Sequence, residues 1–274
     1  MVDGGVLISQ DLSCAGQVSL SVALPILGAC GLRPTVLPTA ILSTHTGFAE
    51  NSFADLSTEM PKIVKHWQKE SFCFDALYLG YLGSHALDFW LKNIDRISHQ
   101  SETILLDPAM ADNGKLYRGL DQNYVVKMSK LISRTTILTP NITEAALLLG
   151  ETIKDSSLSY AKYLAEALTN RFSIPNVIIT GIPLDHERIA EVGVTNQQNW
   201  SLIQEKIPGS FFGTGDIFAS CFLAAFLHSN GLQQSCAIAA EFVEKAIISS
   251  TEQDKRLGPN YAAGLSWLLN QLKE

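Results

Sequence analysis

The chain has 274 residues, which is enough for one large α/β domain or for two small ones. Hydrophobic residues make up 46% of it and charged residues 17%, so a sizeable core can be buried and disorder is not expected. The net charge of −7 argues against a nucleic-acid partner, but it leaves room for a local anion site.

The cysteines and the apolar stretches indicate a compartment. Five cysteines are scattered along the chain without a Cys-x-x-Cys pair, which favours reduced thiols in a cytoplasmic protein over a disulfide framework or a zinc site. The longest apolar stretch, near Ile217–Leu227, is too short to span a bilayer, and the first residues lack the basic start of a secretion signal. We therefore expect a cytoplasmic protein with no membrane partner.

In the first half of the chain, short apolar runs alternate with stretches of helical periodicity. The predicted strands are Val6–Ser9, Thr35–Leu42, Asp75–Leu79 and Thr103–Leu106. The predicted helices are Gln17–Ala29, Leu56–Lys69 and His85–Ile97. Pro38 suggests an edge or a bulge in the second strand.

The second half continues the alternation. The predicted helices are Tyr124–Ile132, Ile142–Leu149, Leu158–Thr169, Thr214–His228, Leu232–Ser250 and Tyr261–Gln271. The predicted strands are Thr136–Leu138 and Asn176–Thr180, followed by two hairpin-like strands, Ile189–Thr195 and Trp200–Ile207. Alternation of this kind predicts a mostly parallel sheet covered by helices on both faces, in a single domain over residues 1–274.

Polar residues follow several of the predicted strands. In open parallel sheets, ligands bind beyond the carboxyl ends of the strands. That rule gathers polar segments on one rim of the sheet: Ser9–Asp11, Ser43–Gly47, Gly80–Ser84, Asp107, Asn141–Glu144 and Thr180–Gly181.

The turn Gly213-Thr214-Gly215-Asp216 precedes a long apolar run. Glycine tolerates positive φ and lets a ligand approach the backbone. With Thr214 as the N-cap, Gly215 and Asp216 would lie in the first helical turn, where free N–H groups attract anions. A phosphate-binding turn with a carboxylate beside it suits phosphoryl transfer to a hydroxyl. An ordinary helix start, with Asp216 complementing the dipole, is the alternative.

Two further carboxylates, Asp107 and Glu144, are candidate supports for Mg²⁺, directly or through water. Asp-Pro is also a common strand terminator, and Asn141-Ile142-Thr143-Glu144 matches a capping box. Tyr81, which lies between Gly80 and Gly83, could stack on an aromatic ligand or simply fill a turn.

Taken in order, these segments resemble the ribokinase-like kinases and, within them, the pyridoxal kinase family, over nearly the whole chain. The resemblance implies a three-layer α/β/α fold with a central, mostly parallel sheet. The segments that carry the resemblance are Ile8–Ser13, Leu37–Gly47, Gly80–Ser84, Asp107–Met110, Leu138–Glu144 and Gly213–Asp216.

The resemblance implies ATP-dependent phosphorylation of the 5′-hydroxymethyl group of pyridoxal, pyridoxine or pyridoxamine. It implies Asp216 as the base, with an anion hole formed by backbone N–H groups of the glycine turn. It also implies Mg²⁺, a monovalent cation as a further candidate, and a homodimer. The other implied sites are Gly213, Thr214, Gly215, Thr180 and Asn141 for the nucleotide, Ser9, Thr46 and Tyr81 for the vitamer, and Asp107 and Glu144 for the metal.

Two departures from the family pattern stand out. Ala111 replaces a glycine in the Asp-Pro loop, and Ser13–Gln17, which contains one glycine, lacks the denser glycine pattern that we expect. Hydroxymethylpyrimidine kinase is a second enzymatic hypothesis, because it uses the same fold on a similar ring alcohol. A catalytically silent B6-binding protein is the third. The loop at Ala109–Tyr117 is a candidate lid by its length and composition.

Overall fold

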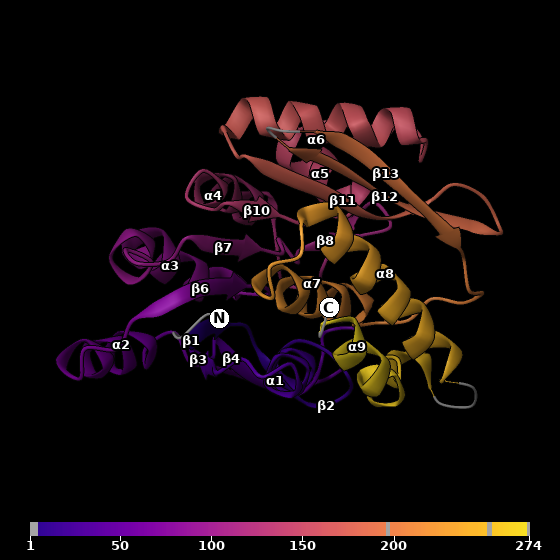
Figure 1. The fold of residues 1–274 in the computed structure, drawn as a ribbon. Helices are drawn as coiled ribbons and strands as arrows, with labels where there is room; N and C mark the ends of the chain where they lie inside the picture. The colour runs from indigo at the N-terminus through magenta and orange to yellow at the C-terminus, as the bar shows by residue number, and fades with distance from the viewer. Residues whose placement is uncertain (1–4, 196–197, 251–253, 273–274) are drawn as a thin grey trace. The chain divides into compact units, whose positions relative to one another are not determined.

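The computed structural model describes residues 5–195, 198–250 and 254–272 (Figure 1). No helix within those ranges is long and apolar enough to cross a membrane. The chain divides into two compact units, one formed by the residues up to Asp75 together with those from Ile207 onward, and the other by Ala76–Lys206. The single kinase domain over residues 1–274 stays a prediction.

In the first unit, two short sets of strands carry the N-terminal polar segments. Strands β1 (Gly5–Ser9) and β3 (Pro34–Val36) pair in parallel, and β1 is almost completely buried. A separate sheet has the order β2-β4-β5, in which β2 is parallel to β4 and β5 is antiparallel to it. Its strands are β2 (Leu12–Ala15), β4 (Ala40–Thr44) and β5 (Phe53–Asp55).

The predicted strand Thr35–Leu42 is wrong, because the chain leaves one sheet for the other within it. β3 ends at Val36 and β4 begins at Ala40, across a break that contains Pro38. Proline has no N–H group to donate to a ladder. The N–H groups on either side of Pro38 still bond to the first strand and its extension, Leu37 to the Ile8 carbonyl (2.9 Å) and Thr39 to the Gln10 carbonyl (3.0 Å).

The longest helices of the first unit come from its C-terminal part. Helix α7 (Thr214–Leu227) is buried on every side from Ile217 to Ala225, as expected of a uniformly apolar helix, and it packs against α8 and α1. The predicted helix Tyr261–Gln271 is divided into a 3₁₀ turn, η2 (Tyr261–Gly264), and α9. The other helical elements are α1 (Leu20–Ala29), α2 (Met60–Lys69), α8 (Leu232–Ile248), the 3₁₀ turn η1 (Lys255–Leu257) and α9 (Leu265–Gln271).

The second unit contains a mostly parallel sheet with the strand order β13-β12-β11-β10-β7-β6. Strands β6, β7, β10 and β11 are mutually parallel, and the hairpin β12–β13 is antiparallel to β11. The strand bounds are β6 (Phe74–Leu79), β7 (Thr103–Leu106), β10 (Ile137–Leu138), β11 (Asn176–Pro183), β12 (Arg188–Thr195) and β13 (Asn199–Glu205).

Helices connect these strands, and α6 packs on β11 and β12. The helices are α3 (Gly83–Ile97), α4 (Gln122–Ile132), α5 (Ile142–Leu149) and α6 (Leu158–Phe172). The predicted loop after Asp107 contains a small antiparallel pair, β8 (Ala111–Asp112) and β9 (Lys115–Leu116), which the sequence reasoning missed. The hairpin thus follows β7 in the chain. Asn141, which follows β10, forms an isolated bridge to Thr180 of β11.

Candidate active site

The glycine turn at the start of α7 differs in detail from the prediction. Gly213, and not Thr214, is the N-cap, with φ of 78°, and Thr214 is already the first helical residue. Two features require glycine at position 213: the left-handed φ favours it, and a Cβ atom there would clash with the carbonyl oxygen of Gln17. Asp216 lies in the first helical turn, as predicted. An anion facing this turn would meet backbone N–H groups at the positive end of the helix dipole.

The surroundings of Asp216 favour proton transfer near neutral pH. Desolvation by burial, together with the smaller effect of the nearby Asp11 charge, raises the pKa of Asp216 to about 7, while a hydrogen bond with the Ser19 backbone opposes both effects. A base is most effective when its pKa lies near the working pH. The carboxylate therefore has the properties of a general base, which a simple helix-capping aspartate would not need.

Asp11 is a buried carboxylate to which the sequence reasoning gave no role of its own. Its two carboxylate oxygens accept hydrogen bonds from the hydroxyls of Ser19 (2.6 Å) and Ser13 (3.0 Å). Burial raises the pKa of Asp11, and these hydroxyls counteract that effect. Ser19 has φ of 49° and ψ of −129°, which is strained for a residue with a side chain. Ser19 thus links Asp11 to Asp216.

The predicted vitamer-binding residues of the first unit lie on β1 and on the turn after β4. Ser9 is fully buried, and its hydroxyl donates to the Leu37 carbonyl (2.9 Å). Thr46 is half-buried in the turn that follows β4. Between Ser9 and Asp11, the side-chain amide of Gln10 is fully buried and has no hydrogen-bond partner among the described residues. Buried amides without partners are costly, so Gln10 is a position where a water or a ligand group would be stabilised.

In the second unit, Glu144 organises the loop after β7. One carboxylate oxygen accepts the N–H groups of Met110 (3.0 Å) and Ala111 (3.4 Å), and the other accepts the N–H group of Asn141 (3.0 Å). Asn141 completes a capping box by accepting the N–H group of Glu144. Burial raises the pKa of Glu144 to about 8, against these three N–H donors, which lower it. The capping-box reading of Asn141–Glu144 is therefore confirmed.

The alanine that replaces a family glycine is accommodated without strain. Ala111 is absent from the described residues with positive φ; it is buried in β8, and its carbonyl accepts the Asn141 amide (2.8 Å). The left-handed positions are two and three residues further on, at Asn113 (φ 49°) and Gly114 (φ 77°), where the hairpin turns. The substitution therefore leaves this loop a regular hairpin, which the Thr143 hydroxyl also holds through the Gly114 N–H group (3.1 Å).

A pocket of about 270 Å³ lies beside this hairpin. Thr180, which lies within the register shift between Ile179 and Ile182 in β11, forms a bridge with Asn141. Gly181 lines the pocket with φ of 62°. Asp107 (8% exposed) and Tyr81 are not among the lining residues. The pocket is lined by Asp112, Asn113, Gly114, Asn141, Ile142, Thr143, Ile153, Gly181 and Pro183.

The donor set of this pocket fits a magnesium–phosphate complex better than a cage made of protein ligands alone. Within the described ranges, no cluster of three or more His, Cys, Asp or Glu side chains could hold a metal ion. Mg²⁺ commonly uses one or two carboxylates together with phosphates and waters, and the Asp112 carboxylate, which the sequence reasoning missed, lies in the pocket lining. Glu144 already uses most of its lone pairs on backbone N–H groups, so a role at the metal would run through water.

The first unit has a helix N-terminal turn that carries a carboxyl group with a raised pKa, and the second unit has a mostly parallel sheet with a polar pocket at its edge. Each feature suits the class of nucleotide-using α/β kinases. Comparison with known proteins identifies the family. Residues 28–260 match the phosphomethylpyrimidine kinase family, and the chain belongs to it.

Two solved structures and one curated relative place the chain near the pyridoxal kinases. A provisionally assigned phosphomethylpyrimidine kinase from Bacteroides thetaiotaomicron, solved in an orthorhombic form with pyridoxal, is 33% identical with a TM-score of 0.91, covering 100% of this chain and 96% of the other. Pyridoxal kinase from Lactobacillus plantarum is 30% identical with a TM-score of 0.87, covering 98% and 97%. Pyridoxal kinase from Arabidopsis thaliana is 26% identical, covering 93% and 85%.

These relationships confirm the predicted fold class and the resemblance to pyridoxal kinases within the ribokinase-like superfamily. They also confirm that the chain is a kinase of this family. The roles assigned to individual residues remain predictions.

Proposed function

We propose that this kinase transfers the γ-phosphoryl group of ATP to the 5′-hydroxymethyl group of pyridoxal, pyridoxine or pyridoxamine. The observation that carries the proposal is the Asp216 carboxyl group, whose pKa is raised to about 7 in the N-terminal turn of α7. The choice of a B6 vitamer is supported by the 33% identity with a relative that was solved with pyridoxal.

The first unit would supply the base. Asp216 accepts the proton of the substrate hydroxyl while the hydroxyl oxygen forms a bond to the γ-phosphorus, and the bond from that phosphorus to the bridging oxygen of ADP breaks. N–H groups of Gly213, Gly215 and Asp216, with Thr214 in the same turn, stabilise the negative charge that develops. Ser9 and Thr46 are assigned to the pyridine ring.

The second unit would bind the phosphates and the metal. Asn141 and Thr180, which form the bridge described above, are assigned to the nucleotide phosphates, and Tyr81 to the ring of the vitamer. Asp107 and Glu144 are assigned to Mg²⁺, with Asp112 added because it lines the pocket. When bound, Mg²⁺ would neutralise phosphate charge. The proposal also includes a cytoplasmic location, a homodimer and a monovalent cation as a further candidate cofactor.

Hydroxymethylpyrimidine kinase is the second candidate, because the matched family carries the name phosphomethylpyrimidine kinase. It would use the same base and the same phosphate residues on a related ring alcohol. A silent B6-binding protein is less well supported now that Ala111 is seen to fit a regular hairpin.

A coupled assay for ADP release tests all three hypotheses. The purified chain is supplied with ATP and Mg²⁺ and with each vitamer or hydroxymethylpyrimidine in turn. The proposal expects the largest kcat/KM with a vitamer, and an Asp216→Asn variant that binds the vitamer without turnover serves as the control. A larger kcat/KM with hydroxymethylpyrimidine would select the second candidate. Vitamer binding without ADP release from the unmodified chain would select the silent protein.

A further inference from the structure

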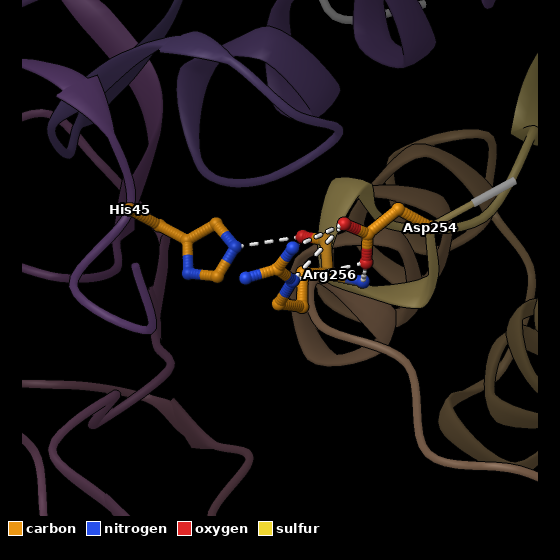
Figure 2. Close-up of polar contacts among 3 residues, drawn as sticks. All are labelled: His45, Asp254 and Arg256. Carbon is orange, nitrogen blue, oxygen red and sulfur yellow. Dashed lines mark hydrogen bonds and ion pairs between the residues drawn. The ribbon is translucent and has the colours of Figure 1, made fainter. Parts of the chain in front are cut away.

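His45 joins two segments of the first unit that lie far apart in the sequence. Its Nε2 atom lies 2.7 Å from the carbonyl oxygen of Arg256 (Figure 2). Its Nδ1 atom lies 3.1 Å from the Gly47 nitrogen. A carbonyl oxygen can only accept a hydrogen bond, and a backbone N–H group can only donate one. Both contacts are satisfied together by one form of the ring, the neutral imidazole with its proton on Nε2.

The acceptor of that proton is itself held in place. Asp254 caps the 3₁₀ turn η1, and its carboxylate accepts the backbone N–H group of Arg256 (3.0 Å). The same carboxylate accepts hydrogen bonds from the guanidinium of Arg256, from Nε (3.0 Å) and from Nη2 (2.6 Å), as Figure 2 shows. Because residues 254 and 256 are so close in sequence, this fork fixes the local backbone, and the carbonyl of Arg256 stays aimed at His45.

Ring contacts surround the same imidazole. Its centroid lies 4.5 Å from that of Phe212 and 5.0 Å from that of Phe48. The Arg256 guanidinium lies over the Phe48 ring at 4.5 Å. A Cβ atom on Gly47 would come within 2.7 Å of the His45 ring and within 2.8 Å of the Phe212 ring, so a side chain at position 47 would displace these rings.

The turn η1 also contacts the glycine turn of α7. The Phe212 N–H group donates to the Lys255 carbonyl (3.4 Å), and the Gln17 N–H group donates to the Leu257 carbonyl (2.6 Å). The carbonyl of Gln17 in turn lies where a Cβ atom on Gly213 would have to be. We name the segments His45–Phe48, Phe212–Gly213 and Asp254–Gly258 together the histidine clamp.

We propose that His45 is a positioning residue: as the neutral Nε2–H tautomer it locks the histidine clamp and so holds Thr46 and the Gly213–Asp216 turn in their working arrangement. Thr46 lies between His45 and Gly47, the two residues that the hydrogen bond to Nδ1 joins, and Phe212 directly precedes Gly213. His45 acts through these neighbours and is assigned no contact with the reacting atoms. The inference rests on the proposed roles of Thr46 and Asp216.

Three variants separate the clamp from general stability. His45→Phe keeps a ring against Phe212 and loses both hydrogen bonds, whereas His45→Gln restores an N–H donor near the position of Nε2. His228→Phe is the matched control, since His228 Nε2 contacts the Cys30 carbonyl at 2.8 Å at the far end of α7 from Asp216. It removes a similar contact from the same unit without touching the clamp.

We expect His45→Phe to lower kcat about tenfold and to raise the KM for the vitamer. His45→Gln should recover most of that loss, and His228→Phe should keep normal kinetics while its thermal midpoint falls about as far as that of His45→Phe. Equal kinetics for His45→Phe and His228→Phe, or no recovery with Gln, would overturn the proposal.

Hydrogen exchange tests whether His45 holds the clamp together, and this test does not depend on a vitamer being the substrate. In His45→Phe, peptides that contain Thr46–Gly47 and Phe212–Gly215 should both exchange faster than in the unmodified chain, and in His228→Phe neither should. Unchanged exchange in both peptides of His45→Phe would show that His45 locks nothing, even if the kinase proposal holds. If the unmodified chain released no ADP while the peptides of its clamp exchanged slowly, the proposed function alone would be refuted.

Discussion

The structure makes a quantitative prediction about Gly213, which can be compared with a second glycine of nearly the same backbone conformation. Gly213 has φ of 78° and Gly150, the C-cap of α5, has φ of 71°. A Cβ atom on Gly150 would meet nothing within 4 Å, whereas one on Gly213 would clash with the Gln17 carbonyl and approach Val18 at 3.0 Å. The two alanine variants therefore share one backbone cost and differ in the steric cost.

The left-handed conformation costs an alanine about 1–2 kcal/mol, and this is all we expect for Gly150→Ala. Gly213→Ala adds the cost of overpacking against a backbone atom, roughly 1–3 kcal/mol, so its total should be roughly 2–5 kcal/mol. Since the turn must move to relieve the clash, we also expect kcat to fall by about a hundredfold, as small displacements of catalytic groups can do.

Urea unfolding followed by circular dichroism measures the free energy of unfolding of both variants, and the ADP assay measures kcat. If Gly213→Ala were no less stable than Gly150→Ala, the close approach of the Gln17 carbonyl would not constrain the turn. If Gly213→Ala were unstable but fully active, the position of this turn would not matter for the reaction. Either result would refute this account of how α7 begins.

Three further predictions concern carboxyl groups. Asp216→Asn should fold normally, as judged by its thermal midpoint, and should lower kcat by about a thousandfold or more, because it cannot accept the proton. In the unmodified chain kcat/KM should rise with pH and reach half of its maximum near pH 7, the raised pKa of Asp216. Asp11→Asn should move the midpoint of this rise to lower pH, because the charge of Asp11 raises the pKa of Asp216. A kcat/KM that stays constant from pH 5.5 to 8.5 would contradict the assignment of Asp216. Burial raises the pKa of Glu191 to about 7, so its stabilising contribution is complete below its unfolded pKa and is lost as pH rises through 7. Between pH 5 and pH 8 the free energy of unfolding of Glu191→Gln should therefore rise relative to that of the unmodified chain, by up to roughly 3 kcal/mol. Urea titrations at both pH values would measure this difference.

Elements with local signals were predicted closely. The strand Thr103–Leu106 and the helix Ile142–Leu149 have the predicted bounds. The helix is marked at both ends by its own sequence, with an Asn141 cap at the start and a left-handed Gly150 at the end. Signals of this kind act over a few residues, so they can be read without knowing the rest of the fold.

Features that depend on distant partners were not predicted. The stretch Thr35–Leu42 has the composition of one strand, but its halves pair with different partners, β1 and β2. The cap at Gly213 instead of Thr214 depends on Gln17, nearly two hundred residues earlier in the chain. The Asp112 carboxylate was read as part of a loop, because its place in the pocket depends on a hairpin held by Glu144 and Asn141.

The pKa of Asp216, the proposed base, depends on the same kind of distant contact. Asp216 is identifiable from its motif, but its pKa near 7 is not, because that value comes from burial and from the charge of Asp11. Ser19 connects the two carboxylates: its hydroxyl donates to Asp11 and its backbone bonds to Asp216, in a conformation that costs a residue with a side chain about 1–3 kcal/mol. A glycine at position 19 would relieve that strain, yet it would lose the hydroxyl that lowers the pKa of Asp11 against the effect of burial. The strain at Ser19 is thus explained as the cost of holding the Asp11 carboxyl group beside Asp216, where its charge adds to burial, the larger cause, in raising the pKa of the proposed base to about 7.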